Sequence, residues 1–143
     1  MSELTLAVAQ KIVADVLAHS RAHNLNPMGV VVVDDRGALK AAAMEDGSSL
    51  IRWKIAFGKA HGAVSWGAGS RKVAAIAADR PHFLAAVSQL VDGGLLPVAG
   101  GVLIRDAAKK IIGAVGVSGD TSDHDEQAAI AAINAAGLLA DGG

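Results

Sequence analysis

The sequence contains no cysteine and no tyrosine, and its aromatic residues amount to two phenylalanines and two tryptophans. Without cysteine the chain has neither a disulfide framework nor a thiolate metal site. It also lacks an excess of charge of either sign, because its formal net charge is -1 and its pI is about 6.5. Nucleic-acid-binding proteins usually carry a basic face, so we expect no nucleic-acid partner.

Long apolar runs are missing as well. No stretch approaches the roughly 20 apolar residues that a transmembrane helix needs, so we expect no membrane partner. Residues 1–5, Met-Ser-Glu-Leu-Thr, carry neither a basic start nor a long apolar core, and we therefore expect no signal peptide and a cytoplasmic protein. A length of 143 residues predicts one domain, 1–143, which is large enough to bury about two thirds of its unfolded surface.

Small apolar side chains make up for the scarcity of aromatics. Hydrophobic residues are 52% of the chain although aromatics are only 3%, and glycine occurs 17 times. Burial contributes about 25 cal/mol per Å² of apolar surface, so small side chains each contribute little. We therefore expect the domain to form a homo-oligomer that adds a subunit interface to its own core.

The hydrophobic pattern predicts an α/β (α+β) protein in the order helix, hairpin, helices, hairpin, helix. This order favours an antiparallel sheet over repeated βαβ units. The predicted helices are 6–23, 48–66, a short one after the turn 67–72, 81–91 and 123–139, the predicted strands are 28–34, 38–44, 98–105 and 110–118, and 141–143 is predicted to be a loose tail. The unbroken valines 30–33 indicate a strand that is covered on both faces.

The glycines of the second hairpin suggest a crowded backbone. Gly113 and Gly116 lie inside a predicted strand, where a glycine usually marks the close approach of a ligand or of a packed helix. Gly100, Gly101, Gly116 and Gly119 are therefore candidate ligand-binding residues, although they can equally serve packing. Ser118 ends the strand and is a candidate for contact with a polar ligand group, but its flanks are not those of a nucleophile elbow.

Several polar residues have spacings with more than one interpretation. His19 and His23 are four residues apart on one predicted helix and are candidate haem-iron or metal ligands, yet a histidine at a helix C-terminus is also favoured by the helix dipole. His124, Asp125 and Glu126 are candidate metal ligands. The competing interpretation is that carboxylates here cap the last helix, with Asp123-x-x-Glu126 as a capping box.

Three cations form a separate candidate site. Lys59, His61 and Arg71 can anchor a carboxylate, and either His61 or a carboxylate can move a proton. Lys59 and His61 are the candidate catalytic residues, although Lys59 can equally be a solvated surface residue. Arg71 lies in the glycine-rich turn 67–72, which enters a predicted helix whose first backbone N–H groups favour anions, although the turn can also be a plain linker.

The chain resembles the GlcG/HbpS family of small haem-binding and haem-degrading-type proteins, whose domain also occurs at the C-terminus of some corrinoid adenosyltransferases. The motifs that carry the resemblance are LTLAVAQKI, VVVDDRGALKAAAMEDG, IAFGKAHGA, PVAGGVLI, IIGAVGVSG and DHDEQAA. The resemblance implies a profilin-like three-layer α/β/α fold with an antiparallel sheet of about five strands and helices on both faces. It also implies haem as a possible cofactor, a pocket near Lys59, and dimers that assemble into a higher even-numbered oligomer.

Three functions remain open at this point. The first is a cytoplasmic small-ligand-binding protein of the haem-binding type. The second is a cofactor-independent catabolic enzyme that transfers a proton on a small anionic organic acid. The third is a non-catalytic oligomeric accessory module.

Overall fold

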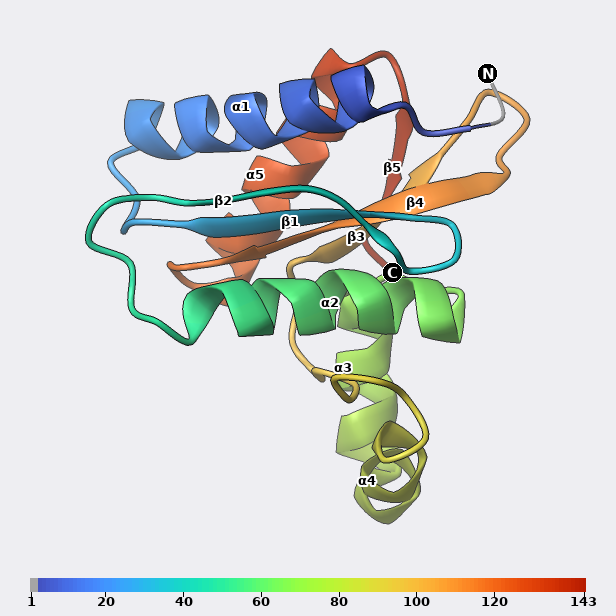
Figure 1. Cartoon of the computed structure of the whole chain (residues 1–143). Helices are drawn as coiled ribbons and strands as arrows, with labels where there is room; N and C mark the ends of the chain where they lie inside the picture. Colours follow the sequence, from blue (N-terminus) through green and yellow to red (C-terminus); the bar gives the residue numbers. More distant parts are fainter. Residues whose placement is uncertain (1–2) are drawn as a thin grey trace.

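A five-stranded antiparallel sheet separates two layers of helices in the computed structural model, which describes residues 3–143 (Figure 1). The strand order is β2-β1-β4-β3-β5. The strands are β1 (Gly29–Asp34), β2 (Leu39–Met44), β3 (Gly101–Arg105), β4 (Ile111–Ser118) and β5 (Leu139–Asp141). The helices are α1 (Leu6–Ala22), α2 (Arg52–Trp66), α3 (Ser70–Asp79), α4 (Pro81–Ser88) and α5 (Ser122–Ala135). The predicted α+β fold with five strands and helices on both faces is confirmed.

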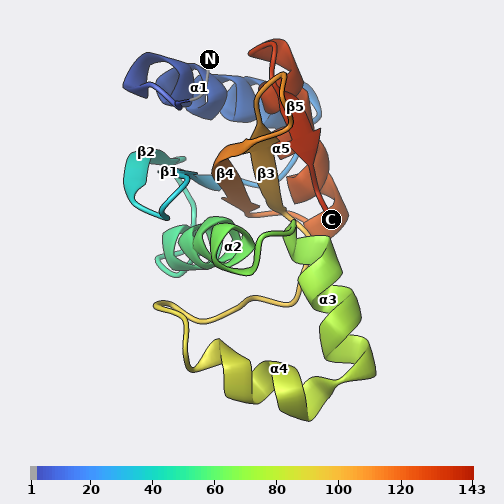
Figure 2. The same ribbon diagram turned by 90° about the vertical axis from the view of Figure 1, so that its right-hand side faces the viewer.

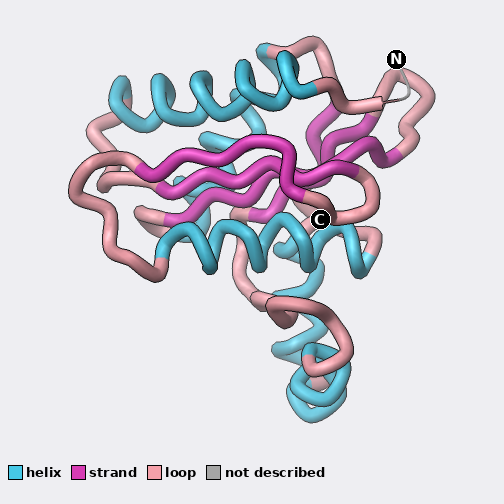
Figure 3. Tube along the Cα trace, viewed as in Figure 1, coloured by secondary structure: helices cyan, strands magenta, loops and turns pink. Residues whose placement is uncertain are grey.

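The helices divide between the two faces of the sheet. Helices α1 and α5 cover one face and α2 covers the other, whereas α3 and α4 form an arm beyond α2 (Figure 2). Figure 3 shows that the strands form one continuous layer between them. No helix within residues 3–143 combines the length and the apolarity that crossing a bilayer requires.

Strand β1 is covered on both faces, as its unbroken valines predicted. Val30 and Val32 belong to the core beneath α1 and α5. Val31 and Val33 belong to the smaller core beneath α2. Neighbouring residues of a strand point to opposite faces, so a strand between two helical layers is apolar at every position.

Side-chain caps begin the first and last helices, and the cap of the last helix differs from expectation. Thr5 caps α1, because its hydroxyl accepts a hydrogen bond from the backbone N–H of Val8 at 3.2 Å. The last helix is capped by Thr121, whose hydroxyl accepts from the N–H of His124 at 3.2 Å. The expected capping box at Asp123 was therefore wrong, although Asp123 and Asp125 do lie in the first turn, where carboxylates complement the dipole.

The C-terminal segment differs most from expectation. The predicted helix to 139 ends at Ala135, and Gly137 follows with a φ of 76°. The segment predicted to be a loose tail contributes to β5, which pairs with β3 and gives that strand its second neighbour. An ion pair of 2.9 Å between Arg105 and Asp141 joins the two strands. Three residues are too few for a period-2 pattern to be recognised in the sequence.

Helix α2 packs with its backbone directly on the sheet. A Cβ atom at Gly116 would overlap the carbonyl oxygen of Ala56, and one at Gly101 would overlap the carbonyl oxygen of Lys59. Glycine is required at both positions because any side chain would push α2 away. Of the two explanations for these glycines, the packed helix is the one that the structure shows.

Candidate functional site

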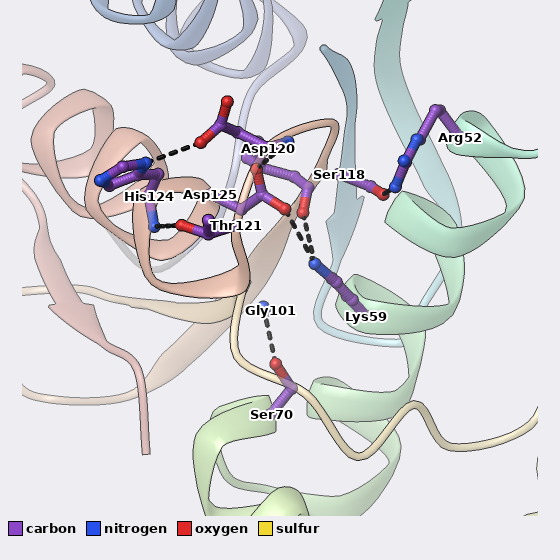
Figure 4. Close-up of polar contacts among 10 residues, drawn as sticks. Arg52, Lys59, Ser70, Gly101, Ser118, Asp120, Thr121, His124 and Asp125 are labelled. Carbon is purple, nitrogen blue, oxygen red and sulfur yellow. Dashed lines mark hydrogen bonds and ion pairs between the residues drawn. The ribbon is translucent and has the colours of Figure 1, made fainter. Parts of the chain in front are cut away.

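A buried ion pair connects three elements at the C-terminal end of β4. The ammonium of Lys59 donates to the carbonyl oxygen of Val117 at 2.8 Å and to Oδ2 of Asp125 at 3.2 Å (Figure 4). The side chains of Lys59 and Asp125 are only 3% and 2% exposed. Oδ1 of Asp125 accepts the backbone N–H of Asp120 at 2.9 Å. Helix α2, strand β4 and helix α5 are thereby tied together around one buried, hydrogen-bonded ion pair.

Burial lowers the pKa of Lys59, because desolvation penalises the ammonium more than the nearby carboxylate of Asp125 favours it. The neighbouring cation Arg52 lowers this pKa further. Arg52 itself donates to the hydroxyl of Ser118 at 3.2 Å (Figure 4).

The glycine motif surrounds this pair, but the protein itself fills the space. Gly100 has a φ of 119°, and a Cβ there would lie 2.7 Å from Nζ of Lys59. The N–H of Gly101 donates to the hydroxyl of Ser70 at 2.7 Å. At Gly119 a Cβ would overlap the carbonyl oxygen of Pro27. The candidate ligand residues Gly100, Gly101, Gly116, Ser118 and Gly119 are thus gathered at one place and are all buried.

The candidate cations do not converge on a common site. Lys59 points into the protein, whereas His61 is two residues further along the helix and lies on another side. Arg71 binds Asp123 and Glu126 through its guanidinium, and these contacts raise its pKa. Its charge is therefore used to hold α3 against α5.

The candidate metal ligands also point to separate partners. His124 contacts Asp120 through Nδ1 at 2.6 Å, Asp125 binds Lys59, and Glu126 binds Arg71. No group of three or more histidine, aspartate or glutamate side chains within residues 3–143 is arranged to hold a metal ion.

The hydrogen bonds that Asp120 accepts from Asn26 and His124 predict a measurable acid sensitivity. Hydrogen bonds from the backbone N–H of Asn26, the ring of His124 and the backbone N–H of Thr121 lower the pKa of Asp120 from 3.8 to about 2. A carboxyl whose pKa is lower in the folded protein stabilises the fold at pH values above the pKa that it has in the unfolded chain. For Asp120 this contribution is lost as the pH falls from 3.8 towards 2. We therefore expect Asp120→Asn to flatten the decline in unfolding free energy between these pH values, as measured by urea denaturation. An equally steep decline in Asp123→Asn and Asp120→Asn would contradict this assignment.

His19 and His23 lie at the C-terminal end of α1, on the face of the sheet opposite α2. Their rings stack with centroids 4.0 Å apart, and Nδ1 of His23 lies 2.8 Å from the carbonyl oxygen of His19. Partial burial and the neighbouring His23 lower the pKa of His19, which favours its neutral form. The helix does bring the pair together, as the spacing predicted.

A second region is an apolar depression of about 510 Å³ between α2 and the edge strand β2. It is lined by Val31, Leu39, Ala42, Trp53, Lys54, Phe57 and Gly93. Leu39 is 61% and Trp53 43% exposed, which leaves large apolar side chains uncovered. The ammonium of Lys54 lies 5.8 Å from the centroid of the Trp53 ring, so one cation accompanies this surface.

Trp53 and Phe57 were not among the residues predicted to form a site. Trp53, Phe57 and His61 are each four residues apart, which places three rings along one side of α2. This spacing was the feature of the sequence that could have indicated an aromatic surface. Phe57 and His61 are stacked with ring centroids 5.2 Å apart. Apolar spacing of this kind is also typical of core residues, so the sequence alone cannot tell whether such rings are covered.

Comparison with known proteins identifies the family to which this chain belongs. A family model described as haem degrading protein HbpS-like matches residues 4–134. The crystal structure of HbpS is 28% identical, with a TM-score of 0.81 over 94% of this chain and 91% of that one. The Klebsiella pneumoniae protein ORFY is 26% identical, with a TM-score of 0.85 over 97% and 94%.

A structure titled as a PduOC–haem complex has a TM-score of 0.84 over 95% of this chain and 96% of that one. At 20% identity this likeness shows the fold alone. No curated protein sequence matches the chain. The match over residues 4–134, supported by the shared fold, shows that this chain belongs to the HbpS-like family.

Proposed function

We propose that this protein binds haem or a closely related tetrapyrrole in the apolar depression between α2 and β2. The observation that carries the proposal is the combination of exposed aromatic and aliphatic surface with a cation in one hollow. A tetrapyrrole is flat and apolar over its ring and carries carboxylates at its edge, so it matches both features. Ligand sites are typically concave and apolar with a few polar groups that set orientation.

The family supports the same ligand class, since its description names haem. A protein of the same fold has been crystallised as a haem complex. The buried Lys59–Asp125 pair then has a supporting role, because it holds α2 at a fixed height above the sheet. We further propose that the protein acts in the cytoplasm as a homo-oligomer, which would cover part of its remaining exposed apolar surface.

Haemin titration followed by Soret absorbance tests the binding site. We expect saturable binding, and we expect Trp53→Ala to weaken it by about tenfold, which corresponds to about 1.4 kcal/mol for the loss of one aromatic stacking contact. Leu90→Ala is the matched control, since Leu90 is 83% exposed on the arm and lies outside the depression.

A non-saturating response of the unmodified protein would refute haem binding. Saturable binding that Trp53→Ala leaves unchanged, but that His19→Ala or His23→Ala removes, would move the site to the opposite face of the sheet.

A further inference from the structure

The depression offers no side chain that ordinarily holds haem iron. Proteins ligate haem iron through histidine, cysteine, methionine or tyrosine. None of these residue types is present among the seven lining residues. His61 adjoins the depression, because its ring stacks on Phe57.

Both ring nitrogens of His61 face other parts of the protein. Nδ1 lies 3.3 Å from the hydroxyl of Ser65. On the other edge, a Cβ atom at Gly37 would lie 2.7 Å from Cδ2 and 2.9 Å from Nε2. The hairpin turn therefore lies against the Nε2 edge, along which an iron atom would have to approach. His61 packs between Phe57 and this turn and is not presented as a ligand.

The remaining histidines and methionines within residues 3–143 do not line the depression. His19 and His23 are on α1, across the sheet from α2 (Figure 2). His124 lies on α5 and is held by Asp120, which precedes that helix, and His82 lies on the arm helix α4. Of the two methionines in this part of the chain, Met28 is completely buried in the core beneath α1 and α5. Met44 ends β2 outside the lining of the depression, and its sulfur lies against Gly29, where a Cβ atom would be 2.9 Å from it.

Resting on the proposed function, we propose that the depression recognises the macrocycle and its carboxylates and not the metal. Trp53 and Phe57 supply faces for offset stacking, Leu39 and Ala42 supply apolar contact, and Lys54 pairs with a carboxylate at the edge of the ring. The ligand class is then planar anionic tetrapyrroles with or without iron. An iron porphyrin bound here would take no histidine, cysteine, methionine or tyrosine ligand from the lining of this depression.

Parallel titrations of the full chain with haemin and with iron-free protoporphyrin IX test this inference. We expect the two dissociation constants to agree within about threefold, because the iron of haemin gains no bond to the protein at this site. Lys54→Ala is expected to weaken both by the same factor, about fivefold. His61→Gln, which keeps a polar side chain of similar size, should change neither affinity nor the Soret maximum of bound haemin.

The outcomes separate the inference from the proposed function. Protoporphyrin binding more than about thirtyfold weaker than haemin binding overturns the inference and leaves haem binding intact. The inference is also overturned, with haem binding intact, if His61→Gln shifts the Soret maximum of bound haemin and weakens the binding of haemin but not of protoporphyrin. If neither porphyrin binds, for example because a second copy of the chain covers the depression, the proposed function and the inference fail together.

Discussion

Gly116→Ala is expected to prevent folding or to lower the free energy of unfolding by about 3 kcal/mol or more, the upper range for overpacked cores. The added Cβ would overlap the carbonyl group of Ala56 and lie 2.9 Å from the backbone nitrogen of Ala60. These are backbone atoms of α2, so no rotamer change can relieve the overlap. The helix must move away from β4, and this opens the core formed by Val31, Leu103 and Ala114. Urea denaturation followed by far-UV circular dichroism measures the effect.

Gly62→Ala is the matched control, because it also adds one methyl group to the interface of α2. The nearest atom there is Cδ2 of Leu95 at 3.3 Å, the end of a side chain that can adjust. Alanine is favoured over glycine in a helix by about 1 kcal/mol, which offsets this contact. We expect a change within about 1 kcal/mol of zero. If Gly116→Ala were as stable as Gly62→Ala, the close packing of α2 on β4 would be refuted.

Lys59→Met is expected to destabilise the protein by about 3–5 kcal/mol, the range for removing one partner of a buried ion pair. The substitution leaves the carboxylate of Asp125 2% exposed and without its counter-ion, and it removes the donor to the carbonyl of Val117. The neutral double variant Lys59→Met/Asp125→Asn should recover part of this loss. Its amide carries no charge, and its side-chain oxygen can still accept the N–H of Asp120. A double-mutant cycle by urea denaturation measures the coupling between the two residues.

Lys11→Met provides the comparison with an exposed pair. Lys11 and Asp15 form an ion pair on the surface of α1, with 52% and 35% of their side chains exposed. Exposed pairs contribute about 0–1 kcal/mol, so we expect a small change. Equal effects of Lys59→Met and Lys11→Met would show that the Lys59–Asp125 pair is not buried as described.

The properties that the sequence determined by itself are those set by neighbours along the chain. The valines 30–33 indicated a doubly covered strand, because the alternation of side chains along a strand is local. Glycine at 116 within an apolar strand indicated close backbone contact, although not whether a helix or a ligand makes it. The motifs PVAGGVLI, IIGAVGVSG and DHDEQAA, with the segments before them, indicated the family that the comparison then showed.

The tertiary structure decided which of the polar residues are available to a ligand. Lys59 meets Asp125 across 66 positions of sequence, and Arg71 meets Glu126 across 55, so neither cation is free although each looked so in the sequence. The depression exists because β2 is an edge strand and α2 leaves Trp53 uncovered beside it. Charge pairing and burial depend on distances between residues that are remote in the chain. Periodicity describes only each element's own faces, so it cannot reveal which face another element will cover.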